Sequence, residues 1–195
     1  MRIIYWSDFN CPYSYIGLKR LSDAVDELNL TPEWELKSFE LPLTYEITAD
    51  IKKIAEKDDL EINPISLKSS RNAHRLIKFV QNKHPNFSQK LVFKIYESNF
   101  EKNEDISDIN VLADIASSIG LNEFEIKEML LSESYDFEVE LDTQDALFNG
   151  ITSIPHYILN VNGEQLIVPG AFEKEDFKIA IEDLINGEIK YKSFI

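Results

Sequence analysis

Hydrophobic and polar residues alternate near both ends of the chain, whereas the middle repeats its hydrophobic residues at helical spacing. Residues 2–6 alternate as in a short β-strand, Pro12 to about Leu28 carries hydrophobic residues three or four positions apart, and residues 34–39 alternate again. This pattern predicts a strand, a helix and a second strand. Two parallel strands joined through a helix require a right-handed crossover and a mostly buried sheet.

Between residue 41 and about residue 147 the strand patterns disappear and helical periods replace them. Asp108 is a predicted N-cap, and Gly120 is a predicted C-terminal stop for the same helix. The candidate helices cover residues 49–57, 67–83, 87–99, 109–119, 123–132 and 135–148. We therefore expect an all-helical block in this part of the chain.

The alternating pattern returns after Gly150. Residues 156–160 and 165–168 predict two strands, and Asn162-Gly163 between them is a strong hairpin signal. An amphipathic helix is then predicted over residues 175–185.

Without the helical block, the order of elements is βαβ-ββα, which is that of a minimal thioredoxin-like sheet. The predicted fold class is therefore α/β, a thioredoxin-like fold with a large all-helical insertion. Residues 1–40 and 151–195 are predicted to form the two parts of the thioredoxin-like domain, and residues 41–150 the insertion domain.

Composition narrows the classes of function. The 195 residues are 44% hydrophobic and 28% charged, which is typical of an ordered globular protein. The formal net charge of −15 disfavours nucleic acid as a partner, because such a surface repels phosphate. Hydrophobic runs are far shorter than the roughly 18 residues that cross a membrane, so we expect no membrane segment.

The N-terminal residues form a predicted strand and not a secretory signal. A single cysteine excludes an intramolecular disulfide and agrees with a reducing compartment, so we expect the cytoplasm.

That cysteine, Cys11, lies between the first predicted strand and the first predicted helix. Proline is favoured at the first helical position, so Pro12 makes Cys11 the N-cap, and unpaired backbone N–H groups should point at its sulfur. These donors and the helix dipole favour thiolate over thiol. Ser14, in the first turn, is expected to hydrogen-bond the thiolate. A lone cysteine is more often an inert buried residue, but this position favours a reactive one.

The segment Ile154-Pro155 precedes the third predicted strand and has two interpretations. A trans proline is tolerated where a strand begins. Alternatively, a cis bond facing Cys11 would turn the backbone of Ile154 toward an extended substrate.

At these residues the sequence resembles the DsbA family of thioredoxin-fold proteins, and more narrowly its cytoplasmic FrnE-like branch. The similar segments are Cys11-Pro12-Tyr13-Ser14 with Tyr15-Ile16-Gly17, Asn72-Ala73-His74-Arg75-Leu76, Asp105 to Leu121, Thr152-Ser153-Ile154-Pro155, and Val168-Pro169-Gly170-Ala171. The resemblance spans nearly the whole chain.

The resemblance implies thiol–disulfide exchange, with Cys11 as nucleophile, Ser14 and Pro155 as its catalytic partners, and a substrate of thiol or disulfide type, protein or small molecule. It also places Asn10, Tyr13, His74 and Ile154 at the substrate, although a satisfied core histidine is the commoner interpretation of His74. We expect no bound cofactor and no metal, because no ligand spacing links the three histidines to Cys11.

Dithiol members of the family carry cysteine where this chain has Ser14. A mixed disulfide on Cys11 would therefore need glutathione or another small thiol as co-substrate to resolve it. Isomerisation, deglutathionylation and peroxide reduction remain open. The alternative is a glutathione-dependent transferase or isomerase, similar to the kappa-class transferases and hydroxychromene carboxylate isomerases, which carry Ser at the position of Cys11. A non-enzymatic adaptor is the third option, and a homodimer is left open.

Overall fold

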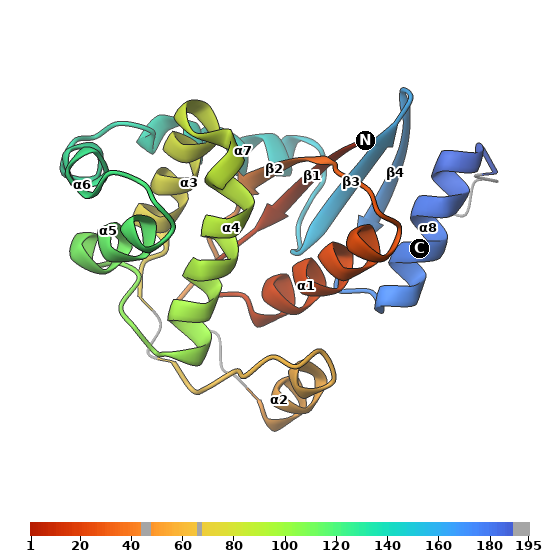
Figure 1. Ribbon diagram of the computed structural model, residues 1–195, viewed down its shortest axis with the longest axis horizontal. Coiled ribbons are helices and arrows are strands. Elements are labelled where there is room, and N and C mark those ends of the chain that lie inside the picture. The colour runs from red at the N-terminus through yellow and green to blue at the C-terminus, as the bar shows by residue number, and fades with distance from the viewer. Residues whose placement is uncertain (44–47, 66–67, 189–195) are drawn as a thin grey trace.

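A four-stranded sheet forms the centre of the protein in the computed structural model, which describes residues 1–43, 48–65 and 68–188. The strands β1 (Arg2–Ser7), β2 (Glu33–Ser38), β3 (His156–Val161) and β4 (Glu164–Pro169) lie in the order β2-β1-β3-β4 (Figure 1). β1 pairs in parallel with β2 and antiparallel with β3, and β3 pairs antiparallel with β4. The predicted βαβ-ββα order and fold class are confirmed.

The helices follow the predicted periods closely. They are α1 (Pro12–Glu27), α2 (Ala49–Glu56), α3 (Arg71–Lys83), α4 (Pro85–Tyr96), α5 (Ile109–Ser118), α6 (Glu123–Leu131), α7 (Asp136–Phe148) and α8 (Lys174–Asn186). Asp108 caps α5 as predicted, accepting a 2.7 Å hydrogen bond from the backbone N–H of Asn110. The predicted start of the second insertion helix at Leu67 lies outside the described residues. One element was not predicted: α4 continues into a π-helical turn, η1 (Glu97–Glu101).

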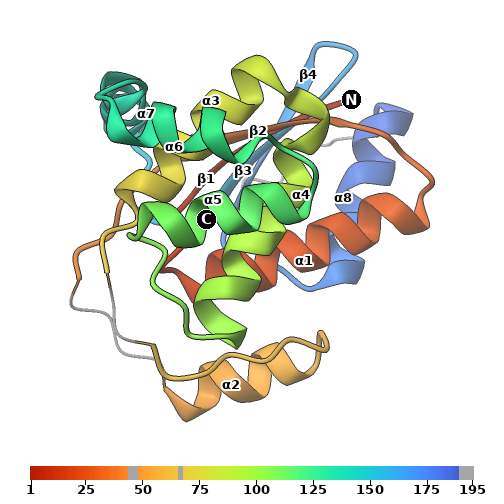
Figure 2. The same ribbon diagram turned by 60° about the vertical axis from the view of Figure 1, so that its left-hand side comes forward.

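The two faces of the sheet are covered by different parts of the chain. On β1, Ile3 and Tyr5 belong to the main core, which also contains residues of α1 and α8. The alternate residue Trp6 packs with Ala146 of α7 and with Ile151 on the opposite face. Figures 1 and 2 show α8 beyond β4 and the helices α3 to α7 gathered on the β2 side.

The helical block also covers the edge of the sheet at β2. Lys78 of α3 donates a 3.2 Å hydrogen bond to the carbonyl of Leu36, and the backbone N–H of Ser38 donates a 2.8 Å bond to the carboxylate of Asp142 on α7. Lys78 and Asp142 form an ion pair. Burial lowers the pKa of Lys78, and the carboxylate of Asp142 opposes this effect. Backbone groups of an edge strand thus find side-chain partners.

Helix α1 is fixed closely against the turn between β4 and α8. A Cβ atom added to Gly17 would lie 2.6 Å from the hydroxyl of Tyr157, so only glycine allows this approach. The buried Arg20 donates to the carbonyl of Ala171 at 3.2 Å and pairs with Asp58 at 2.8 Å.

The main core runs without interruption from the sheet into the helical block. The predicted division at residues 40/41 and 150/151 stays a prediction. In the described part of the chain, no helix has the length and apolar character needed to cross a membrane.

Candidate active site

The loop from Asp8 to Cys11 leads from the end of β1 into α1. Cys11 is the N-cap and Pro12 occupies the first helical position, as predicted. The backbone N–H of Cys11 donates a 3.0 Å hydrogen bond to the carbonyl of Asp8, which closes a tight turn. The backbone N–H groups of Ser14 and Tyr15 donate to the carbonyl of Cys11, at 3.0 and 3.3 Å. The sulfur accepts no capping hydrogen bond at normal geometry, yet the backbone of Ser14 and Tyr13 lowers the pKa of Cys11, so the predicted capping of the sulfur stays a prediction.

The segment around Pro155 lies at the same end of the sheet. Trp6 pairs with His156, so Pro155 is level with the residue at which β1 ends and the Cys11 loop begins. The Ile154–Pro155 peptide bond is cis. The carbonyl of Pro155 accepts a 2.7 Å hydrogen bond from the backbone N–H of Gly170. The catalytic role of Pro155 and the substrate contact of Ile154 stay predictions.

The environment of the Cys11 sulfur acts against the predicted thiolate, which stays a prediction. Cys11 is only 3% exposed. Burial raises the pKa of Cys11 to about 11; the nearby Ser14 side chain and the backbone of Ser14 and Tyr13 act in the opposite direction, and the negative charge of Asp8 raises the pKa further. Burial is the largest of these effects, and it favours the thiol over the thiolate at neutral pH.

Of the other predicted site residues next to Cys11, Tyr13 is exposed, whereas Ser14 and Asn10 are buried. Tyr13 is 37% exposed, in agreement with the prediction. Ser14 and Asn10 are buried, and among the described residues the Ser14 hydroxyl and the Asn10 side-chain oxygen have no hydrogen-bond partner. The Asn10 amide nitrogen donates a 2.8 Å bond to the carbonyl of Lys68. The predicted hydrogen bond from Ser14 to the cysteine is therefore absent at normal geometry, although Ser14 lowers the pKa of Cys11.

Asp8 is a central residue of the site that sequence patterns missed. Its carboxylate is fully buried and accepts hydrogen bonds from the backbone N–H groups of Leu41 at 2.7 Å and Asn10 at 3.3 Å. His74 of α3 is also fully buried, and its Nε2 lies 3.3 Å from the same carboxylate. His74 Nδ1 has no hydrogen-bond partner in the part of the chain that the structure describes. The position of Asp8 directly after a strand was the only available signal.

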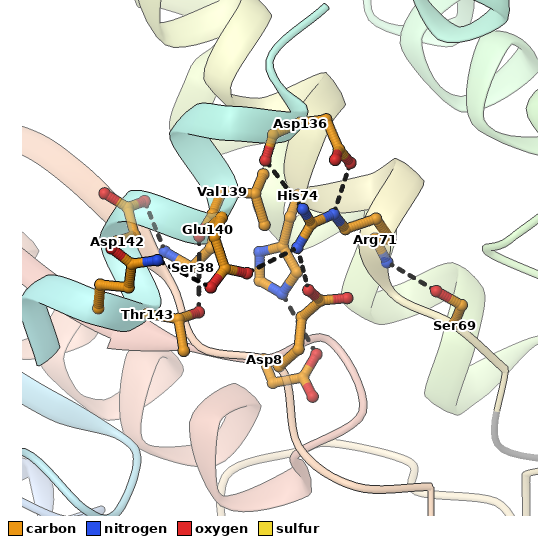
Figure 3. Close-up of polar contacts among 12 residues, drawn as sticks. Asp8, Ser38, Ser69, Arg71, His74, Asp136, Val139, Glu140, Asp142 and Thr143 are labelled. Carbon is orange, nitrogen blue, oxygen red and sulfur yellow. Dashed lines mark hydrogen bonds and ion pairs between the residues drawn. The ribbon is translucent and has the colours of Figure 1, made fainter. Parts of the chain in front are cut away.

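Figure 3 shows His74 directed at Asp8, and Arg71 on the same helix directed at the carboxylates of α7. Arg71 donates to Asp136 at 2.7 Å and to Glu40 at 2.6 Å. A hydrogen bond from Arg71 lowers the pKa of Asp136. Because His74 is buried against Asp8, the structure favours the core interpretation of this histidine, and its predicted substrate contact stays a prediction.

Aromatic rings enclose the inner side of the loop. The ring of Phe9 packs against His74 with centroids 5.0 Å apart, and Tyr15 stacks on Tyr96 at the same distance. The Tyr96 hydroxyl donates a 3.2 Å hydrogen bond to the carbonyl of Asp8. Burial raises the pKa of Tyr96, so this hydroxyl remains a donor over the whole physiological range.

Within residues 1–43, 48–65 and 68–188, no group of three or more histidine, cysteine, aspartate or glutamate side chains is arranged to hold a metal ion. The site thus consists of a buried thiol at a helix terminus, a neighbouring hydroxyl, and a buried carboxylate–imidazole pair.

Comparisons with solved structures support the same fold. The chain is similar to a probable DsbA oxidoreductase, SCO1869, from Streptomyces coelicolor, with a TM-score of 0.80 and 23% identity over 100% of this chain and 94% of that one. It is also similar to a 2-hydroxychromene-2-carboxylate isomerase, with a TM-score of 0.78 and 15% identity over 96% and 98% of the two chains.

A third similar structure is the cytosolic disulfide reductase DsbM from Pseudomonas aeruginosa with GSH, with a TM-score of 0.69 and 14% identity over 95% of this chain and all of the other. At these identities the likeness shows the fold alone. The model of the DSBA-like thioredoxin domain family, however, matches residues 2–182, which is most of the chain. The protein therefore belongs to the DSBA-like thioredoxin domain family, a family of thiol oxidoreductases.

Proposed function

We propose that this protein is a thiol–disulfide oxidoreductase that works through the single cysteine Cys11, with glutathione or another small thiol as its second substrate. One observation carries the proposal. The only cysteine of the chain is the N-cap of α1, at the end of the sheet where the Pro155 segment also lies. Family membership and the similarity to a disulfide reductase with GSH support it.

The reaction consists of two exchanges. In the first, the Cys11 thiolate attacks one sulfur of a disulfide, a Cys11 mixed disulfide forms, and the other sulfur leaves as a thiolate that takes up a proton. In the second, a glutathione thiolate attacks the substrate sulfur of the mixed disulfide, and Cys11 leaves as a thiolate and is protonated again. Each exchange forms one S–S bond and breaks one, so no additional oxidant is required.

The acidity of Cys11 sets the rate that we expect. With its pKa raised to about 11, only a small fraction of Cys11 is thiolate at neutral pH. A thiolate of high pKa is a strong nucleophile but is rare, and it leaves poorly. The proposed enzyme therefore either works slowly on glutathione disulfides or gains reactivity when a substrate changes the surroundings of Cys11.

The experiment is the reaction of the purified protein with oxidised glutathione, followed by intact-protein mass spectrometry from pH 7 to pH 11. We expect one glutathionyl group per chain, formation that accelerates with pH, and release by reduced glutathione. The Cys11→Ser variant is the control and should form no adduct. Absence of an adduct at pH values where iodoacetamide modifies Cys11 would overturn the proposal.

Ser14→Cys provides a second arm. The substitution supplies the missing resolving thiol, so we expect an internal disulfide with Cys11 and oxidation of a dithiol peptide that the natural chain does not oxidise. A Ser14→Cys variant that forms the disulfide but oxidises no peptide would show that more than the resolving thiol is missing.

A glutathione-dependent isomerase or transferase is the second candidate, and the protonated state of Cys11 favours it. A buried thiol is a hydrogen-bond donor that would stabilise the thiolate of bound glutathione instead of attacking it. The similarity to the hydroxychromene carboxylate isomerase agrees with this role.

Calorimetric titration of glutathione into the Cys11→Ser variant separates the two candidates. Serine keeps the donor, so retained glutathione binding and turnover of an organic substrate would favour the isomerase. Loss of all activity in Cys11→Ser would favour disulfide exchange. A cytoplasmic location, assignment to the FrnE-like branch and a homodimer remain expectations that accompany the proposal.

A further inference from the structure

A π-helical turn lies next to the Cys11 loop and has no part in the chemistry described so far. The turn η1 continues α4 without a break, and the backbone N–H of Lys102 donates a 3.1 Å hydrogen bond to the carbonyl of Glu97, five residues earlier. Single π-helical turns are rare and occur frequently at functional sites. Three consecutive residues of η1, Ser98 to Phe100, are buried.

The wide turn places two side chains on the Cys11 side of the helix. Phe100 stacks on Tyr15 of α1, with ring centroids 6.1 Å apart and the planes at 10°. Asn99, which is 4% exposed, donates a 2.8 Å hydrogen bond from its amide nitrogen to the carbonyl of Phe9. An α-helical turn has fewer residues and offers fewer adjacent positions on one face.

The contact of Asn99 completes the attachment of the loop to α4. The carbonyl of Asp8 accepts from the Tyr96 hydroxyl and from the backbone N–H of Cys11, and the next carbonyl, that of Phe9, accepts from Asn99. Two consecutive carbonyls just before Cys11 are therefore held by the helical block. A buried carbonyl that lost such a donor would cost free energy or would move to find water.

We propose that Asn99 is a positioning residue for Cys11: through the carbonyl of Phe9 it fixes the loop that keeps the thiol covered and holds Cys11 at the end of the sheet where Pro155 also lies. This inference rests on the proposed function, which it deepens by assigning the orientation of the nucleophile to the helical insertion. Asn99 acts through the backbone of the loop, so it is not a catalytic residue.

The experiment measures the pH profile of Cys11 alkylation by iodoacetamide in the natural protein and in Asn99→Ala. Without the amide, the loop loosens and water reaches the sulfur, so the midpoint of the profile should fall from about 11 toward the ordinary value near 9. A fall of one unit raises the alkylation rate at pH 8 about tenfold. Exchange with oxidised glutathione at saturating concentration should not rise in proportion, because the freed thiolate is poorly aimed.

Asn63→Ala is the matched control. The Asn63 side chain donates a 2.9 Å hydrogen bond to the carbonyl of Glu101, so this substitution also removes an amide donor to the turn, but none to the Cys11 loop. We expect a similar loss of thermal stability and an unchanged alkylation midpoint. Equal midpoints in Asn99→Ala, Asn63→Ala and the natural protein would overturn the inference.

If Asn99→Ala does not fold, Tyr96→Phe gives a milder test. It removes the hydroxyl that donates to the carbonyl of Asp8 and that also hydrogen-bonds the buried Ser7, and the midpoint should fall in the same direction by a smaller amount. An unchanged midpoint in a folded Tyr96→Phe protein would also contradict the inference. Alkylation of Cys11 does not depend on turnover, so these midpoints would be the same if the proposed function were wrong. The proposed function is tested separately, by glutathionyl adduct formation.

Discussion

Two consecutive residues of α3, His74 and Arg75, serve two regions with very different hydrogen bonding. Arg75 is buried at the junction of α3 with the end of α6, and all five of its N–H donors have an acceptor. These acceptors are the carbonyls of Met129, Leu130, Ser132 and Ser134 and the side-chain oxygen of Asn72. The carbonyl end of α6 is a natural partner for a cation.

His74 faces the Cys11 region, where hydrogen bonding is incomplete. Its Nδ1, the Ser14 hydroxyl and the Asn10 side-chain oxygen are buried, and no described residue hydrogen-bonds any of these atoms. Native proteins satisfy nearly all buried polar groups, and the exceptions deserve an explanation. The difference teaches that Arg75 ties α3 to the end of α6 with all of its donors, whereas polar atoms near Cys11 are buried without such bonds.

The largest expected effect is the pH dependence of Cys11 alkylation, in the region where hydrogen bonding is incomplete. With the pKa of Cys11 raised to about 11, alkylation by iodoacetamide should accelerate about tenfold for each pH unit, or roughly 1000-fold between pH 7 and pH 10. Stopped alkylation reactions analysed by mass spectrometry measure this. A rate that levels off below pH 9 would mean that the sulfur is solvated and the region is not as closed as described.

The next effect is on the free energy of unfolding and concerns Arg75, whose donors all have acceptors. Arg75→Met should lower the free energy of unfolding by about 3 kcal/mol, because several buried carbonyls lose a charged donor at once. Urea denaturation measures the change. Arg71→Met, which removes ion pairs of a partly exposed arginine, is the control and should cost under about 1 kcal/mol. Equal losses of unfolding free energy in the two variants would contradict the distinction between the two arginines. An altered Cys11 alkylation midpoint in Arg75→Met would contradict the separation of the two regions.

A third effect links Cys11 to stability. Its pKa is higher in the folded protein than the ordinary value near 9, so the unfolded chain loses this proton first as pH rises. The stabilisation is fully present below pH 9 and is lost as the pH approaches 11. It amounts to roughly 2 kcal/mol by linkage. Urea titrations at pH 8 and pH 11 give the free energy of unfolding of the natural protein and of Cys11→Ser. Between these two pH values the natural protein should lose this amount more than the variant does. An equal loss in both proteins would contradict the burial of the thiol.

The smallest effect is expected at Ser14. Among the described residues its hydroxyl has no partner at normal hydrogen-bond geometry, so Ser14→Ala should change the free energy of unfolding by less than about 0.5 kcal/mol. The same substitution removes an influence that lowers the pKa of Cys11, so alkylation at pH 9 should slow severalfold. A loss of 1 kcal/mol or more in the free energy of unfolding would show that the Ser14 hydroxyl is hydrogen-bonded, as the donors of Arg75 are.

Much of the fold could be predicted from the sequence because its signals are local. Alternation located the strands, helical periods located the insertion, and Pro12 located the N-cap at Cys11. The π-helical turn escaped prediction, since its residues continue the helical period of α4 and only the contacts of Asn99 and Phe100 distinguish it.

The sequence located Cys11 at the N-cap of α1, but it did not reveal the burial that raises the pKa of its thiol. A helix terminus favours a thiolate, and that much is readable from the chain. Whether the sulfur reaches water depends on segments 50 to 90 residues away, which bring Tyr96, Asn99 and the Lys68 carbonyl onto the loop. Asp8 and Asn10 look like solvated loop residues in the sequence, and only tertiary packing buries them.

The cover over β2 has a consequence for the behaviour of the protein in concentrated solution. Unpaired strand edges are templates on which other chains add and aggregate. Lys78 and Asp142 occupy backbone groups of Leu36 and Ser38, so a foreign strand cannot pair there without first displacing a buried ion pair. The insertion thus protects one side of the sheet from strand addition, and β4 is left as the edge where such addition would begin.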